Sequence, residues 1–310
     1  MRCGNLDTLD HAIIAALEGN TRRGTQSIAN QVGATPATVK RRLDRLQDEG
    51  FITLSPLVDL RAAGYEYLLL TGIRVQQLSP YQVARRLGEL PESLTVNVTL
   101  GNQDIELVAA ARDREAASRL LAVTLPSIEG VANVEAGLSL DVWKFRSGRQ
   151  DLRDPSPIPA PPLLDELDKR IICSLRNQAR KSNRAVALEI GVSETAVRNR
   201  LARMQANKQL NFSHVWRPIG KKDVAAFVGI DVNSGESQSV CRALTEIAEV
   251  SFVATTLGRH HIICTINVDD LESLTQVLHE NIVPIPGIKG TYPSHCLDQL
   301  VHQLELGFIL

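Results

Sequence analysis

Apolar residues near the start of the chain recur with the period of an α-helix. One apolar helix face is predicted by four residues at helical spacing, Leu9, Ile13, Ile14 and Leu17. Thr25 is a suitable N-cap for a second short helix. Gly33 follows that helix, where a C-terminus favours a left-handed residue. The pattern therefore predicts two short helices in succession.

A third helix is expected after a glycine turn. Thr35 is a suitable N-cap and Pro36 is tolerated at the first helical position. We expect Gly50 to end this helix, whose core-facing residues would be Val39, Leu43 and Leu46. Two short helices joined by a glycine turn are typical of the helix-turn-helix motif.

The pattern then changes to alternating strands and helices. Strands are predicted at 65–75, 94–100, 105–111 and 131–144, and helices at 80–90 and 113–124, the second capped by Asp113. The order β-α-β-β-α-β is that of a ferredoxin-like split unit.

The whole pattern occurs twice. Residues 6–47 align without a gap on 164–205, an offset of 158. The shared residues include Leu6/Leu164, Asp7/Asp165, Leu9/Leu167, Asp10/Asp168, Gly33/Gly191, Arg42/Arg200 and Arg45/Arg203. Further on, Thr99-Leu100-Gly101 matches Thr256-Leu257-Gly258 at an offset of 157. The chain is therefore one two-part unit written twice.

The second copy is expected to repeat the same elements. Its strands would be 225–232, 250–257 and 262–268, and its helices 237–248 and 270–280, with Ser193 capping its third helix-turn-helix helix. Pro293 is expected to interrupt the last strand. The tail from Leu297 to Leu310 is interpreted as either a short helix or an irregular strand.

A proline-rich segment separates the copies. Five of the 14 prolines lie within 146–162, a composition typical of an extended spacer. We therefore expect helix-turn-helix domains at 1–59 and 163–219, ferredoxin-like domains at 60–145 and 220–310, and a linker at 146–162. The predicted fold class is α+β, with two winged-helix-like helix-turn-helix domains alternating with two ferredoxin-like domains.

Net charge alone argues against a nucleic-acid partner, but its distribution does not. The 34 Lys and Arg nearly balance the 35 Asp and Glu. Residues 163–222 hold 13 basic and 5 acidic residues, whereas 223–310 hold 3 and 11. Because DNA affinity depends on the face that meets the phosphates, this cancellation does not exclude DNA.

Simple sequence features argue against a membrane protein, a secreted protein and a disulfide or zinc site. No run of about 18 apolar residues exists, so we expect no membrane partner. The N-terminus does not resemble a signal peptide. Five scattered cysteines favour free thiols in a reducing cytoplasm over disulfides or a zinc site.

The outward faces of the third helices are basic in both copies. Such a helix can enter a major groove, with its cations on phosphates and guanine edges. An ordinary solvated face is the alternative, but two basic third helices favour DNA. The residues that we expect to contact double-stranded DNA are Arg22, Thr35, Thr38, Lys40, Arg41, Arg42 and Arg45, and in copy two Arg180, Ser193, Arg198, Asn199, Arg200 and Arg203.

Taken together, these motifs resemble the Lrp/AsnC family of transcription regulators. The resemblance rests on Leu-Asp-x-Leu-Asp at residues 6 and 164, on the run from Arg22 to Leu43, and on Gly101-x-x-Asp104 and Gly130-Val131. A usual member has one such unit and dimerises. The resemblance therefore implies an intrachain pseudo-dimer, which exposed sheet edges could extend to a homo-oligomer.

The resemblance also implies a ligand-sensing (RAM-type) domain in each copy, which binds amino acids or related small molecules. The candidate effector residues by position are Gly101, Asn102, Gln103 and Asp104, and in copy two Gly258, Arg259, His260 and His261. Asp104 could accept a ligand ammonium group. The family usually has an aromatic residue where Gln103 stands, and His261 replaces the Asp. The alternative is that both glycines only make turns between strands.

No catalytic constellation stands out, so we expect no enzyme, no cofactor and no metal. His260 and His261 would point to opposite faces of a strand, which disfavours two-ligand metal binding. Sirohaem decarboxylases resemble the same family and use His and Arg around a tetrapyrrole, which keeps one enzymatic alternative open. A pure protein-interaction module is a third class. The sequence best fits a cytoplasmic, sequence-specific DNA-binding transcription regulator that responds to a small effector.

Overall fold

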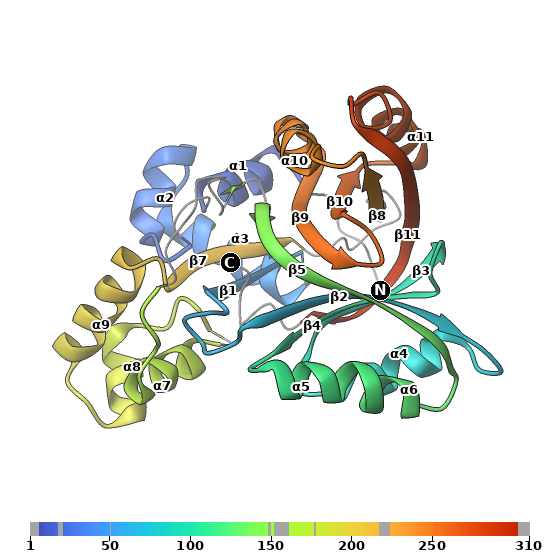
Figure 1. Ribbon diagram of the computed structural model, residues 1–310. Coiled ribbons are helices and arrows are strands. Elements are labelled where there is room, and N and C mark those ends of the chain that lie inside the picture. Colours follow the sequence, from blue (N-terminus) through green and yellow to red (C-terminus); the bar gives the residue numbers. More distant parts are fainter. Residues whose placement is uncertain are drawn as a thin grey trace.

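A computed structural model describes residues 6–17, 21–49, 51–147, 150–151, 161–176, 178–216 and 224–302. Two groups of short helices lie beside a large β-structure whose outer faces carry the remaining helices (Figure 1). The predictions for Gly50 and for 303–310 fall outside the described residues. In the part of the chain that the structure describes, no helix is both long and apolar enough to cross a membrane.

Each helix-turn-helix unit has the three predicted helices. They are α1 (Thr8–Ala16), α2 (Thr25–Val32) and α3 (Pro36–Asp48), and in copy two α7 (Glu166–Leu175), α8 (Asn183–Ile190) and α9 (Glu194–Ala206). Gly33 and Gly191 are left-handed, with φ of 67° and 72°, which confirms the glycine turns. Thr35 and Ser193 cap the third helices as predicted.

The prediction that Thr25 caps the second helix is wrong. Gly24 is the N-cap residue, no side chain caps this end, and Thr25 is the first helical residue. Copy two differs, because the Ser182 hydroxyl accepts a hydrogen bond from the backbone N–H of Ala185. An N-cap residue is extended rather than helical, and Gly24 adopts that conformation here.

The repeated aspartates join the first helix of each unit to the third. The Asp7 side chain caps α1, and the Asp10 carboxylate accepts a hydrogen bond from the backbone N–H of Asp7, which completes a capping box. The Asp10 carboxylate is fully buried and accepts from Arg42 and Arg45 of α3. Copy two repeats the cluster with Asp165, Asp168, Arg200 and Arg203. These identities between the copies therefore hold the tri-helical fold.

Strand β1 (Ile52–Val58) leaves the first unit and pairs with β7 (Leu210–Trp216) of the second. The pairing is antiparallel along the full length of both strands. Neither strand was predicted from the sequence. The position where a winged helix would have its wing is therefore occupied by a ribbon shared between copies. Buried residues of both units also form one continuous hydrophobic cluster.

The two predicted βαββαβ units are present. Copy one has β2 (Tyr67–Val75), α4 (Pro80–Gly88), β3 (Ser93–Gly101), β4 (Ile105–Ala111), α5 (Arg114–Arg119) with a π-helical turn (Leu120–Thr124) and α6 (Leu125–Ser127), and β5 (Val131–Ser147), after which the short β6 (Gln150–Asp151) pairs back on β5. Copy two has β8 (Val224–Val232), α10 (Ser237–Glu246), β9 (Val250–Gly258), β10 (Ile262–Val268), α11 (Leu271–Gln276) with a π-helical turn (Val277–Ile282), and β11 (Ile288–His302).

The two sheets close into one barrel. Copy one is ordered β5-β2-β4-β3 and copy two β11-β8-β10-β9. Strand β3 pairs with β11, and β9 pairs with β5, so within the described chain the eight strands form an antiparallel ring. Helices α4 to α6 cover one side and α10 and α11 the other (Figure 1). The interior cluster draws residues from both copies, including Leu70, Val108, Ala254 and Ile263.

The prediction that Pro293 interrupts the last strand is wrong, and so is the helical alternative for the start of the tail. Strand β11 runs through Pro293 to His302, with bulges. The Pro293 carbonyl faces β3, since it accepts from the Asn102 N–H, and the proline nitrogen therefore faces the same side. Register with β3 begins only at Ser294, so the absent N–H breaks no ladder.

The aspartate–arginine clusters generate a stability prediction. Replacing Asp10 by Ala should lower the free energy of unfolding of the first unit by about 1.5–3 kcal/mol, because charge-assisted hydrogen bonds to two arginines are lost. Asp168→Ala should have a similar effect on the second unit. Urea unfolding monitored by circular dichroism would measure both. Asp48→Ala, at an exposed position of α3, is the control. An Asp10 variant as stable as this control would contradict the prediction.

Candidate nucleic-acid and effector interfaces

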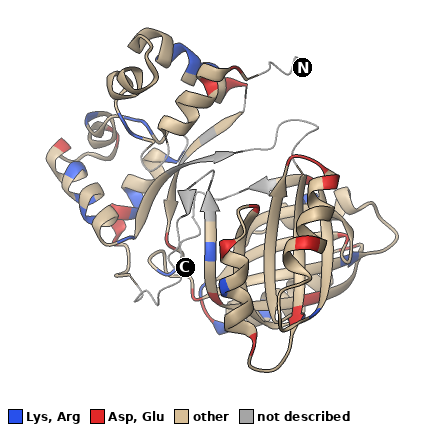
Figure 2. Cartoon of the chain, turned by 90° about the horizontal axis from the view of Figure 1, so that it is seen from above, with Lys and Arg blue, Asp and Glu red and all other residues tan. Residues whose placement is uncertain are grey.

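The third helices expose one basic stripe each. In α3 the exposed residues include Lys40 and Arg41, and the equivalent positions of α9 expose Arg198 and Asn199. Figure 2 shows Lys and Arg along the helices of the helix-turn-helix part, where Asp and Glu also occur. Among the described residues, the four exposed side chains on α3 and α9 form no ion pair with the aspartate clusters. They therefore form the candidate DNA-reading face.

Four predicted DNA contacts have intradomain partners. Arg42 and Arg200 are the most enclosed of them, with side chains 21% and 28% exposed. The hydrogen bond from Arg42 lowers the pKa of Asp7 to about 2, and Arg200 likewise lowers the pKa of Asp165. Arg45 and Arg203 are more exposed but also pair with the buried aspartates. DNA contact by these four arginines stays a prediction.

The polar residues at the start of each third helix act as caps. The Thr35 hydroxyl accepts from the Thr38 N–H, and the two hydroxyls lie 2.9 Å apart. Ser193 accepts in the same way from Ala196. Thr35 and Ser193 are exposed, so each cap lies at the surface of its unit.

Arg22 and Arg180 lie between the two helix-turn-helix units. Arg22 donates to the Lys181 carbonyl at 2.8 Å, and Arg180 donates to the Arg23 carbonyl at 2.8 Å. These two bonds are equivalent under the repeat, and Arg22 also stacks over Phe212 of copy two. Burial lowers the pKa of both arginines. Their contacts fix one unit against the other.

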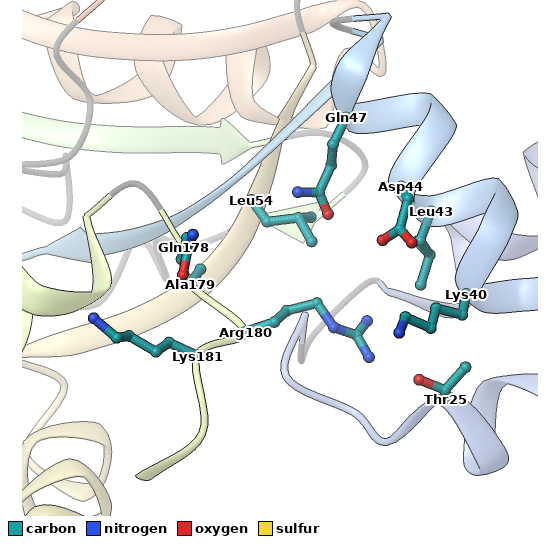
Figure 3. Close-up of a pocket in the computed structure, with 10 residues that line it drawn as sticks. All are labelled: Thr25, Lys40, Leu43, Asp44, Gln47, Leu54, Gln178, Ala179, Arg180 and Lys181. Carbon is teal, nitrogen blue, oxygen red and sulfur yellow. The ribbon is translucent and has the colours of Figure 1, made fainter. Parts of the chain in front are cut away.

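A cleft of about 370 Å³ lies beside this contact. Its lining comes from both units, and the Arg180 guanidinium points toward Lys40 and Thr25 of the first (Figure 3). The charged residues of the lining are the three cations Lys40, Arg180 and Lys181 and the acidic Asp44. Lys40 of the basic stripe therefore borders the space between the two units.

The two predicted effector loops lie where one copy meets the other. Gly101 and Gly258 have φ of 138° and 129°, which favours glycine. A Cβ on Gly101 would lie 2.5 Å from the Pro293 carbonyl oxygen, and one on Gly258 would lie 2.2 Å from that of Ala136. The next residue in each loop donates its N–H to the same carbonyl. Both glycines therefore permit a close approach between the copies.

The two loops place their carboxylates at opposite ends of equivalent polar contacts. In copy one Asp104 pairs with Arg74 of β2 at 3.5 Å and accepts from the Val75 N–H. At the equivalent positions of copy two, His261 lies 3.3 Å from Asp231. The carboxylate is therefore on the loop in copy one and on the strand in copy two. The two loops consequently offer a ligand different charges.

The prediction that His260 and His261 point to opposite faces is wrong. They precede β10 rather than lie in it, and both Nδ1 atoms are 3.3 Å from the Asp231 carboxylate. His260 is buried and stacks on Tyr292. Burial lowers the pKa of His260, and the adjacent Arg259 guanidinium lowers it further. No metal-binding group of three or more His, Cys, Asp or Glu occurs among the described residues.

Arg259 makes a buried ion pair that the sequence analysis missed. Its guanidinium donates to Glu106 of copy one at 2.8 Å, and the two side chains are 3% and 5% exposed. Burial raises the pKa of Glu106, whereas Arg259 and the Ser294 hydroxyl lower it. A Cβ at Gly72 would lie 1.9 Å from the guanidinium, so glycine makes the necessary space. Gly229, its equivalent, makes space for His260. In the sequence, the equivalent positions of Gly72 and Gly229 were the feature that could have indicated these buried side chains.

The chain matches two family models, each of them twice. The AsnC-type helix-turn-helix domain matches residues 6–47 and 164–205. The Lrp/AsnC ligand binding domain matches residues 69–148 and 225–306. Together these four segments cover most of the chain.

Similar proteins each span about two fifths of this chain. The HTH-type transcriptional regulator Ptr1 of Methanocaldococcus jannaschii is 30% identical over 132 residues, which are 41% of this chain and 88% of that protein. The regulatory protein AsnC of Escherichia coli is 27% identical over 132 residues, which are 42% and 87%.

A solved structure matches nearly the whole chain. The sirohaem decarboxylase NirDL superposes with a TM-score of 0.66, over 95% of this chain and 93% of that one, at 15% identity. That likeness concerns the fold. The duplicated domain matches decide the family: this chain belongs to the Lrp/AsnC family, as two family units fused in tandem.

Proposed function

We propose that this protein is a DNA-binding transcription regulator whose two ligand-binding domains respond to small molecules. The observation that carries the proposal is the paired occurrence of an AsnC-type helix-turn-helix and a ligand-binding domain, twice in one chain. The regulators to which the chain is similar support a role other than enzymatic. Such a regulator would act in the cytoplasm, where its cysteines would stay reduced.

The proposed DNA contacts are the exposed residues at the start and along the outward face of each third helix. Lys40, Arg41 and Arg198 would neutralise phosphates or donate to guanine edges, and Asn199 would suit an adenine edge. Thr35 and Ser193, at the helix N-termini, would donate to phosphate. Arg42 and Arg200 would contribute mainly by keeping the third helix in place.

The proposed effector sites are the loops at Gly101–Asp104 and Gly258–His261. In copy one, the Asp104 carboxylate would accept a hydrogen bond from the ammonium group of a ligand. This carboxylate suits the ammonium group of an amino acid. Copy two has His261 on the loop and Asp231 on the strand, so it would take a different ligand or none.

The whole-chain fold likeness favours one second candidate, a tetrapyrrole decarboxylase. The residues that suggested it are engaged otherwise, since Arg259 pairs with Glu106 and His260 packs on Tyr292. Addition of sirohaem to the purified protein distinguishes the two. A protein-bound Soret band and decarboxylated product would support the enzyme, and their absence together with DNA binding would support the regulator.

The basic stripes generate a binding prediction. Lys40→Ala with Arg41→Ala should weaken DNA binding about tenfold or more and reduce the slope of log affinity against log salt by about 2, because two phosphate contacts are lost. Fluorescence anisotropy at several salt concentrations would measure both. Arg114→Ala with Arg119→Ala removes the same charge from exposed positions of the barrel. Equal salt slopes in the two variants would refute the proposed reading face.

The two third helices also predict unlike half-sites. Residues 38–42 read Thr-Val-Lys-Arg-Arg, whereas 196–200 read Ala-Val-Arg-Asn-Arg. Side chains at equivalent helix positions should therefore select different bases. Selection of bound fragments from random DNA, followed by footprinting, should give an imperfect palindrome. Recovery of two interchangeable half-sites would count against this assignment.

The effector loops generate a third prediction. Asp104→Asn should weaken the binding of an amino-acid ligand by copy one about tenfold or more, because a charge-assisted bond to the ammonium group is lost. Calorimetry with a panel of amino acids would first identify the ligand and then compare variants. Glu115→Gln, exposed in the same domain, is the control. Unchanged affinity in the Asp104 variant would place the site elsewhere.

A further inference from the structure

We infer that two rows of side chains at the copy–copy junctions form a pairing code, which makes the two ligand-binding halves complementary to each other and not to themselves. The inference does not depend on DNA binding. It concerns the two places where the barrel is closed between copies, β3 with β11 and β9 with β5. These junctions are equivalent under the repeat, so residue-by-residue differences between them can be compared directly.

The first row contains the buried ion pair. Glu106 of copy one meets Arg259 of copy two, 153 residues away in the sequence. The equivalent positions at the other junction hold Ile263 and Asn102, which carry no charge. If copy one paired with another copy one, each Glu106 would face an asparagine. If copy two paired with itself, each Arg259 would face an isoleucine.

The second row pairs polar with polar and apolar with apolar. Asn97 of β3 is opposite Gln299 of β11, and the Gln299 side chain donates to the side-chain oxygen Oδ1 of Asn97 at 3.0 Å. At the equivalent register position, Ala254 of β9 is opposite Val142 of β5, and both are buried. Pairing of like copies would place Asn97 against valine and Gln299 against alanine.

The consequence follows from counting contacts in an exchange. Two unlike pairs contain two ion pairs and two amide pairs in these rows. If the same four halves re-paired as one copy-one pair and one copy-two pair, both ion pairs and both amide pairs would be lost. The buried Glu106 and Arg259 side chains and the amides of Asn97 and Gln299 would then lie opposite residues that do not pair with them. An uncompensated buried charge is strongly destabilising, so the exchange is unfavourable.

Some contacts between the copies do not discriminate, because they are made to backbone carbonyls. Arg22 and Arg180 donate to equivalent backbone carbonyls, which both copies possess. Lys144 donates to the Thr245 and Ile247 carbonyls at the end of α10, and α4 of copy one ends with carbonyls at the same positions. The total number of these bonds would therefore be the same whether unlike or like copies pair. These bonds to backbone carbonyls are therefore not part of the pairing code.

A symmetrised variant tests the inference without inventing new packing. Glu106→Ile with Arg259→Asn, and Asn97→Ala with Gln299→Val, give each residue the identity of its own equivalent. Both junctions then carry side-chain pairs that the protein already contains. As a matched control, Arg114→Leu with Leu271→Arg exchanges two equivalent exposed residues on the outer helices.

The experiment introduces a protease site within 152–160 of each full-length protein. After cleavage, the nicked protein is unfolded in urea, refolded, and examined by native mass spectrometry, which separates unlike pairs from like pairs by mass. The original sequence and the control should favour the unlike pair at least about tenfold over a random mixture, because like pairing buries unpaired charge. The symmetrised variant should approach the random mixture. A random mixture from the original sequence, or a preference that survives symmetrisation, would overturn the inference.

If the nicked halves do not refold, a double-mutant cycle on the intact chain tests the complementarity of Glu106 and Arg259. Urea unfolding is compared for the original protein, Glu106→Ile, Arg259→Asn and the double variant. Each single change leaves one buried group without its partner, so the double variant should be more stable than the summed single effects by at least about tenfold in the unfolding equilibrium constant. Additive effects would mean that the ion pair supplies no complementarity, and the inference would be wrong.

Discussion

Backbone pairing between the edges of two four-stranded sheets holds the molecule together. A ferredoxin-like sheet alone would leave two edge strands with unpaired N–H and C=O groups. Here each edge meets the opposite edge of the other copy, and a closed ring results. At both junctions a glycine allows the loop to approach a carbonyl of the other copy. Barrel closure, the position of the candidate effector loops and the mutual arrangement of the two ligand-binding halves therefore depend on the same hydrogen bonds.

The helix-turn-helix units depend on a different constraint, the burial of one carboxylate in each. Asp10 and Asp168 have no exposed surface, so each needs partners that offset the loss of water. Two arginines one helical turn apart on the third helix supply them. Residues that a basic helix might use for DNA are thereby committed to its placement. The exposed cations beside them remain available for a ligand.

Much of this fold could be predicted from the sequence, because most of its signals are local. Strands 105–111 and 262–268 were predicted with their observed bounds, since a short apolar run between polar turns marks a buried strand. Strands β1 and β7 were missed because each is stabilised by a partner about 158 residues away. Helical periodicity likewise assigned Arg42 and Arg45 to an outward face. It could not indicate that a carboxylate of another helix would meet them.

The candidate sites were predictable as segments but not as chemistry. Position in the repeat located both loops, whereas the reversed polar contacts depend on Arg74 and Asp231, which lie on strands outside the loop motifs. The kind of contact between the copies helps to explain why the chemistry of the two loops differs. Where the copies contact each other through the backbone, they have stayed alike, because glycine or carbonyl geometry tolerates little change. Where side chains face each other across the barrel junctions, as Glu106 and Arg259 do, the copies differ in charge. Such divergence allows one chain to present two unlike reading helices and two unlike loops on a single symmetric frame.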